Sequence, residues 1–134
     1  MLNLDRLKEG FANRYPEQHI TIDSHTQGEP TRLLVSNSLD LPGTSMKDKR
    51  DQFRSRYDYL RLLLTREPRG HRDMFAAAVT DPVSPEAHFG LIYMDARRYP
   101  YLCGHGTIGA VTTLIETDAL QAKDGEDVIA IDTP

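Results

Sequence analysis

The apolar residues of this chain occur in short stretches, and this limits what the chain can fold into. The longest uninterrupted apolar run, Phe75 to Val79, has five residues, whereas a helix that crosses a bilayer needs about 20. Residues 1–20 contain no apolar segment of the kind found in secretory signals. We therefore expect neither membrane insertion nor secretion. An apolar fraction of 39% in 134 residues predicts one domain with a modest core.

The charge of the chain argues against a nucleic-acid partner. Its formal net charge is −4, from 16 basic and 20 acidic residues. Residues 47–72 are locally basic, but their basic residues alternate with apolar ones, as on the solvated side of an amphipathic helix. The single cysteine excludes an internal disulfide framework and favours a reducing compartment. We expect a cytoplasmic protein that does not bind nucleic acid.

A period of two predicts a β-hairpin near the start of the chain. Within residues 18–26, Ile20 and Ile22 share one face and polar residues occupy the other. Residues 31–36 predict a second apolar strand. The four residues between them, Gln27 to Pro30, are typical of a turn and are expected to connect the hairpin.

Capping and periodicity predict two helices. Ser45 followed by Asp48 is a weak capping box. The apolar residues that follow have the spacing of one helix face and are expected to pack into the core: Phe53, Tyr57, Leu60 and Leu64. Pro68 ends this helix. A second amphipathic helix is predicted over residues 108–117.

The order of the predicted elements defines an α+β class. Three further apolar runs predict strands at 75–79, 89–94 and 128–131. Hairpins joined by tight turns favour an antiparallel sheet with the helices on one side. Residues 1–17 are expected to form a polar N-terminal arm and residues 18–134 the domain. Because the last strand lies at the end of the sequence, we expect a truncated domain.

The segment Leu-Cys-Gly-His-Gly-Thr-Ile-Gly, residues 102–109, is the most informative for chemistry. Its glycines permit a tight turn into a helix, and the unpaired N–H groups at a helix start bind anions such as carboxylates. The same helix end favours thiolate, so the pKa of Cys103 is expected below its ordinary value of about 8.5. His105 could help to polarise the site. Residue chemistry alone leaves open that Cys103 is an inert buried side chain.

Other patterns in the sequence indicate less about function. Only Cys103 and His105 have a plausible ligand spacing, and zinc needs about four ligands, so no metal site is expected. The glycine-rich segment lacks the Lys-Ser/Thr ending of a phosphate loop. Asp23, Ser24 and His25 match a hydrolase triad in composition, but neighbours on a strand point to opposite faces. We expect them to close the hairpin by side-chain hydrogen bonds, and residues 69–71 to form a turn.

Four segments in order resemble motifs of the proline racemase family. They are DSHTQGEPTR, EPRGHRDMF, SPEA and CGHGT, at residues 23–32, 67–75, 84–87 and 103–107. The resemblance runs from about Ile20 onward and concerns the N-terminal part of the family only. It implies a diaminopimelate-epimerase-like lobe, with a curved, mostly antiparallel sheet around a central helix and the second lobe absent. It also implies a homodimer for the full-length family.

The resemblance further implies residue roles. Cys103 matches a catalytic base that removes or delivers the Cα proton of proline or hydroxyproline. Gly104 and His105 match positions whose backbone N–H groups bind the substrate carboxylate, and Phe75 matches an aromatic residue that lines the substrate pocket. No cofactor is implied. We expect Cys103 to start a helix over about 106–117, with its sulfur in a cleft.

Alternatives to a racemase or epimerase remain open at this point. The family's second catalytic residue lies beyond Pro134. A cysteine there defines a racemase or epimerase and a threonine a trans-3-hydroxy-L-proline dehydratase. A truncated, non-catalytic lobe is another possibility. A Cys-His thiol hydrolase is a further one, although its general base normally comes from a separate element, unlike His105.

Overall fold

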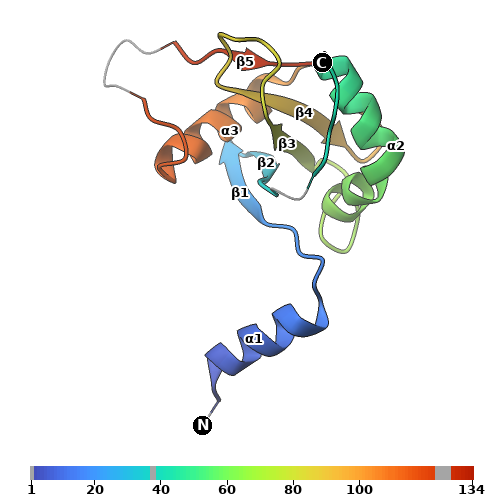
Figure 1. Cartoon of the computed structure of the whole chain (residues 1–134), viewed down its shortest axis with the longest axis vertical. Coiled ribbons are helices and arrows are strands. Elements are labelled where there is room, and N and C mark those ends of the chain that lie inside the picture. Colours follow the sequence, from blue (N-terminus) through green and yellow to red (C-terminus); the bar gives the residue numbers. More distant parts are fainter. Residues whose placement is uncertain (1, 37–38, 123–127) are drawn as a thin grey trace.

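Pairs of strands alternate with helices along most of the chain, and the strands form one five-stranded sheet with one helix on each face (Figure 1). The computed structural model describes residues 2–36, 39–122 and 128–134. The elements are α1 (Leu4–Arg14), β1 (Thr21–Thr26), β2 (Glu29–Leu34), α2 (Met46–Thr65), β3 (Phe75–Thr80), β4 (Phe89–Asp95), α3 (Gly104–Glu116) and β5 (Ile131–Asp132). The predicted order from β1 to β5 is confirmed, and so is the α+β class.

The sheet is mixed, whereas a mostly antiparallel sheet was expected. Its order is β1-β2-β3-β4-β5. The pairs β1–β2 and β3–β4 are antiparallel, but β2–β3 and β4–β5 are parallel. The expectation failed because each parallel pair is joined through a helix, α2 or α3, and such a crossover leaves no local turn motif in the sequence.

The helices lie on opposite faces of the sheet, not on one side as expected (Figure 1). Parallel crossovers are almost always right-handed. The crossover through α2 joins β2 to β3, and the crossover through α3 joins β4 to β5, so both advance toward the β5 edge of the sheet. The first pair of strands runs in the opposite direction to the second pair. Two right-handed crossovers of this kind necessarily place their helices on opposite faces.

Each helix covers its own hydrophobic cluster. The α2 side of the sheet buries Phe53, Leu60 and Leu64 from the predicted stripe, and Tyr57 packs against them half-buried. Ser45 caps α2 by accepting a hydrogen bond from the Asp48 N–H at 3.1 Å. On the α3 side the sheet residues of the cluster are Leu33, Ala77, Phe89, Leu91 and Tyr93. Because both faces are covered, Leu91, Ile92, Tyr93 and Met94 in consecutive positions of β4 are all fully buried.

The β1–β2 hairpin has a tighter turn than expected. Its strands pair up to Thr26 and Glu29, so the connection has two residues and not four. Gln27 and Gly28 both have positive φ, 52° and 89°, which is the conformation that two-residue hairpin turns require. The His25 Nδ1 accepts a hydrogen bond from the Gly28 N–H at 3.1 Å, which confirms the expected side-chain closure.

The two ends of the chain differ from the sequence expectation. Residues 4–14 of the N-terminal arm form α1, which buries no residue and projects from the body (Figure 1). At the other end, β5 has only two residues, because Val128 to Ala130 lie outside the sheet. The Asp132 carboxylate in β5 accepts hydrogen bonds from the Val83 and Ser84 N–H groups, which attaches β5 to the loop between β3 and β4. Within the described ranges, no helix has the length and hydropathy to cross a membrane.

Candidate active site

Cys103 occupies the N-cap of α3, as predicted. The helix begins at Gly104, two residues before the expected start, and Cys103 has the extended backbone typical of a cap (φ −145°, ψ 117°). Its side chain is half-buried against the cluster of Tyr93 and Leu91. The thiol is therefore partly accessible at the edge of the core.

Hydrogen bonds from three elements hold the turn that carries the thiol. The Thr107 N–H and hydroxyl both donate to the Cys103 carbonyl, at 2.9 and 2.8 Å. The Tyr93 hydroxyl on β4 lies 2.5 Å from Thr107 Oγ1. On β1, the Thr26 hydroxyl donates to the His105 carbonyl at 3.2 Å. The start of α3 is thus attached to both β1 and β4.

The residues expected around the thiol come together. His105 Nδ1 lies 3.3 Å from the Cys103 sulfur, and the His105 ring contacts that of Phe75 edge-on, with centroids 5.1 Å apart. A Cβ on Gly106 would lie 2.9 Å from the Phe75 ring and 3.4 Å from the sulfur. Gly104 is exposed, and a Cβ there would meet open space. The site therefore needs glycine at 106 for close packing.

The expected lowering of the thiol pKa is wrong for this chain. Burial raises the pKa of Cys103, and the negative charge of Glu29 adds to the increase. The nearby Gly106 and His105 backbone N–H groups lower the pKa but do not compensate. The sequence argument considered the helix end and could not include the desolvation that packing against Tyr93 imposes.

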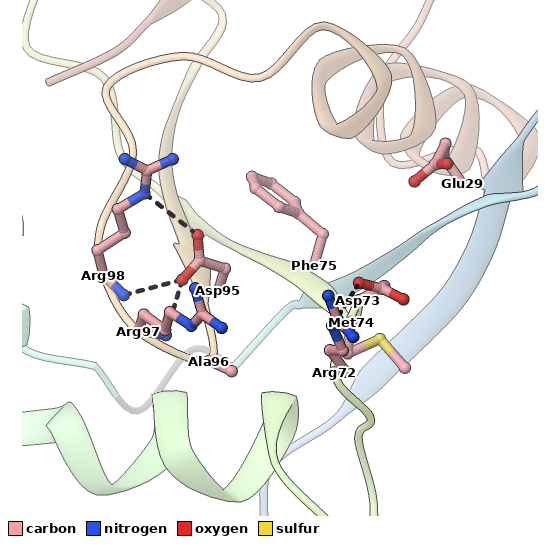
Figure 2. A pocket seen from close by; sticks show the side chains of 9 residues that line it. All are labelled: Glu29, Arg72, Asp73, Met74, Phe75, Asp95, Ala96, Arg97 and Arg98. Carbon is pink, nitrogen blue, oxygen red and sulfur yellow. Dashed lines mark hydrogen bonds and ion pairs between the residues drawn. The ribbon is translucent and has the colours of Figure 1, made fainter.

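A hollow of about 580 Å³ opens beside Phe75 (Figure 2). We call it the Phe75 hollow. Its lining residues come from the starts of β2 and β3 and the end of β4: Glu29, Arg72, Asp73, Met74, Phe75, Asp95, Ala96, Arg97 and Arg98. Figure 2 shows the Phe75 ring in the middle, with Asp95 and Arg98 on one side and Glu29 on the other. Cys103 does not line the hollow, but two lining residues are near it: Phe75 belongs to the same hydrophobic cluster, and the charge of Glu29 acts on the thiol.

The Asp-Ser-His segment is structural, as expected. Arg32 binds both carboxylate oxygens of Asp23, at 2.8 and 2.7 Å, and this bidentate contact lowers the pKa of Asp23. Arg32 also donates to the Leu64 and Arg69 carbonyls. It therefore ties the hairpin to the end of α2 and to the turn that follows, which spans residues 67–69 and not the expected 69–71. No group of three or more potential ligands that could hold a metal occurs in the described part of the chain.

Sequence reasoning missed several residues of the site. Thr26 and Tyr93 position the α3 turn, but each lies at least ten residues from Cys103 in the sequence. Glu29 was interpreted as a turn residue, whereas it begins β2 and influences the thiol. Only the pairing of the strands brings them near Cys103, so no local pattern could have identified them.

The geometry defines an α+β domain with a partly accessible thiol at a helix start. Comparison with known proteins identifies the family. The family model described as proline racemase matches residues 21–134. A proline racemase from Clostridioides difficile is 44% identical over 113 residues, and a 4-hydroxyproline 2-epimerase from Streptosporangium roseum is 39% identical over 113 residues. Each alignment covers 84% of this chain and 34% of the relative.

The solved structures agree on the fold. A hydroxyproline epimerase from Agrobacterium vitis, with bound trans-4-hydroxy-L-proline, superposes with a TM-score of 0.77 at 20% identity. The match covers 86% of this chain and 34% of that protein. The chain belongs to the proline racemase family and spans about a third of the length of these relatives.

Proposed function

We propose that this chain forms the part of a proline racemase-family enzyme that acts on one face of the substrate Cα, with Cys103 as its acid–base group. The substrate class is proline or hydroxyproline, by analogy with the relatives named above. The observation that carries the proposal is the position of Cys103 at the N-cap of α3, beside Phe75 and His105.

The start of α3 has the donors that such a reaction needs. Removing the proton next to a carboxylate builds up negative charge, and preorganised N–H donors are an effective way to stabilise it. The first N–H groups of a helix have no partner within the helix. In this proposal, those of Gly104 and His105 bind the substrate carboxylate, and the Phe75 ring lines the apolar side of the ring-shaped substrate.

In this proposal Cys103 is protonated at rest, in keeping with the direction in which burial shifts its pKa. A two-base inversion needs one group that removes a proton and another that returns a proton to the opposite face of the planar intermediate. A thiol with a raised pKa suits the second role. After donating its proton, Cys103 becomes the thiolate base for the reverse reaction. Because it is the only cysteine in the sequence, the opposing group is a different residue type or comes from another polypeptide segment.

The proposal is tested by incubating the 134-residue chain with L-proline and, separately, with D-proline in alkaline D₂O, where a fraction of the thiol is thiolate. We expect slow deuterium incorporation at Cα, measured by mass spectrometry, for the one enantiomer whose Cα–H faces the sulfur, without a change in optical rotation. Removal and return of the proton on one face by the same thiol exchanges the proton and retains configuration. A Cys103→Ser variant should fall to the buffer rate, whereas Thr112→Ser, an exposed change on the same helix, should not.

Two results would contradict the proposal. Exchange by the Cys103→Ser variant at the wild-type rate would remove Cys103 from the reaction. Rapid inversion by the wild-type chain would show that a second base acts from within these residues, so that the chain would serve both faces. Circular dichroism of each variant verifies that the fold is retained.

A further inference from the structure

A second hollow shares Arg97 and Arg98 with the Phe75 hollow, and it is rich in arginine. It has a volume of about 390 Å³ and is lined by residues of α2 and of the loop between β4 and α3. We call it the arginine hollow. Its charged lining residues are Arg50, Arg54, Asp58, Arg61, Arg97 and Arg98, and two tyrosines, Tyr99 and Tyr101, complete it.

The carboxylates at the arginine hollow do not neutralise its guanidinium groups. Arg50 pairs with Asp51, Arg61 with Asp58 and Arg98 with Asp95. Arg97 makes no ion pair within the described part of the chain, and Arg54 acts electrostatically on Asp58, which already pairs with Arg61. Five arginines therefore face three carboxylates at one concave surface, an excess of two positive charges, although the whole chain is acidic.

Two of the arginines are rigidly held. Arg61 donates to both carboxylate oxygens of Asp58, at 2.7 and 3.0 Å, and to the Asp95 carbonyl at 3.2 Å. Its side chain is 9% exposed and that of Arg50 is 12% exposed. Their guanidinium groups also lie over the rings of Tyr99 and Tyr101, at 5.4 and 5.1 Å from the centroids. These two groups are committed to carboxylates and fix the shape of the hollow, whereas Arg54 and Arg97 are exposed and supply the donors for an anion.

We propose that the arginine hollow binds a small phosphate dianion, either inorganic phosphate or the phosphate group of a monoester. The excess of two guanidinium charges matches the charge of a dianion, and guanidinium forks match the geometry of its oxygens. A volume within the range of small-molecule sites suits a compact ligand. A long polyanion is disfavoured because three carboxylates lie among the arginines.

The bound phosphate would bridge α2 and the loop before Cys103. Arg54 belongs to α2, whereas Arg97 belongs to the loop that ends at the thiol. The same loop is already attached to the C-cap of α2, because Arg66 donates to the Ala96 carbonyl at 3.0 Å. Occupancy should therefore restrain this loop. The inference does not depend on the proposed reaction, because it concerns binding alone.

The test is isothermal titration of the wild-type chain with inorganic phosphate and, separately, with glycerol 1-phosphate. We expect saturable binding of one phosphate group per chain. Arg54→Gln and Arg97→Gln should each weaken binding by about tenfold, the effect of losing one charge-assisted contact. Arg56→Gln is the matched control, since Arg56 lies on α2 but outside the hollow and pairs with Asp40. It should leave the affinity unchanged.

The two ligands distinguish the source of the phosphate. Equal affinities support free phosphate as the ligand, and tighter binding of the monoester supports a phosphorylated metabolite. The proposal is overturned if neither ligand binds, or if Arg56→Gln weakens binding as much as Arg54→Gln. It is also overturned if a single-stranded oligonucleotide binds more tightly than both, because the surface would then serve a polyanion.

Discussion

The thiol of Cys103 is subject to opposing influences at the scale of single atoms. Two backbone N–H groups favour thiolate, whereas burial and the charge of Glu29 favour the protonated thiol, and the latter prevail. In this chain, the N-terminal end of α3 does not by itself lower the pKa of the thiol. The balance depends on how far neighbouring side chains exclude water from the sulfur.

This balance predicts the pH dependence of thiol alkylation. The pKa is raised in the folded chain, so the thiolate fraction at a given pH is smaller than in the unfolded chain. The pH at which the rate of reaction with iodoacetamide increases should therefore be higher in native buffer than in denaturant. The single cysteine makes the mass-spectrometric readout unambiguous. Glu29→Gln removes the nearby negative charge and should move the profile to lower pH.

A native profile that coincides with the profile in denaturant, or lies below it, would contradict this prediction. Glu9→Gln serves as a matched control, because Glu9 lies on α1, away from the thiol. It should leave the profile where it is.

How much of the site the sequence could predict also depends on single residues. Cys103, Gly104, His105 and Phe75 were identified through motifs, and the structure brings the thiol, His105 and Phe75 together. The roles of these residues stay predictions. The direction of the thiol pKa could not be obtained, because it depends on side chains from β2 and β4 that reach the sulfur only after folding.

At the scale of elements, the packing of α3 against the hairpin depends on Gly109. A Cβ there would lie 2.9 Å from Thr31 Oγ1 and 3.0 Å from Ser24 Oγ. Both hydroxyls are buried and have no hydrogen-bond partner in the described residues. The helix thus approaches the sheet too closely for any larger side chain at this position.

We therefore predict that Gly109→Ala destabilises the chain by about 1–3 kcal/mol, the usual cost of overpacking a core. Gly104→Ala, on the same helix, is the matched control. A Cβ at 104 meets open space, so this change should be neutral or slightly stabilising. Urea denaturation of both variants measures the difference. Equal effects of the two changes would show that Gly109 is not a close-packing position.

The arrangement of elements was only partly encoded in local patterns. Capping and periodicity identified α2, and alternation identified the hairpin, because these features depend on neighbouring residues. The parallel pairs were missed because partners such as Arg32 and Ala76 are more than forty residues apart. One feature did indicate helices on both faces, namely the continuous apolar run in β4, since a strand covered on one face alternates.

The whole molecule consists of a packed body and one peripheral helix. The body extends from β1 to β5, and the family match begins at residue 21, where β1 begins. The helix α1 lies before this range and buries no residue. A hydrogen bond between Tyr59 and Glu17, at 2.5 Å, connects the segment after α1 to α2 and raises the pKa of Tyr59 to about 12.

The separation of α1 from the body predicts that its removal leaves the stability of the body unchanged. Deletion of residues 1–14 retains Glu17 and its contact with Tyr59, and all the described residues that it removes, 2–14, are exposed. The melting temperature should change by less than about 2 °C, because a larger shift would require a loss of roughly 0.5 kcal/mol or more. Helical signal in circular dichroism should fall, since α1 is lost. Leu4, Leu7 and Phe11 form an exposed apolar face on α1. The chain that lacks residues 1–14 should therefore also self-associate less than the wild type, as measured by sedimentation velocity. A drop in melting temperature well beyond this limit would show that α1 packs against the body.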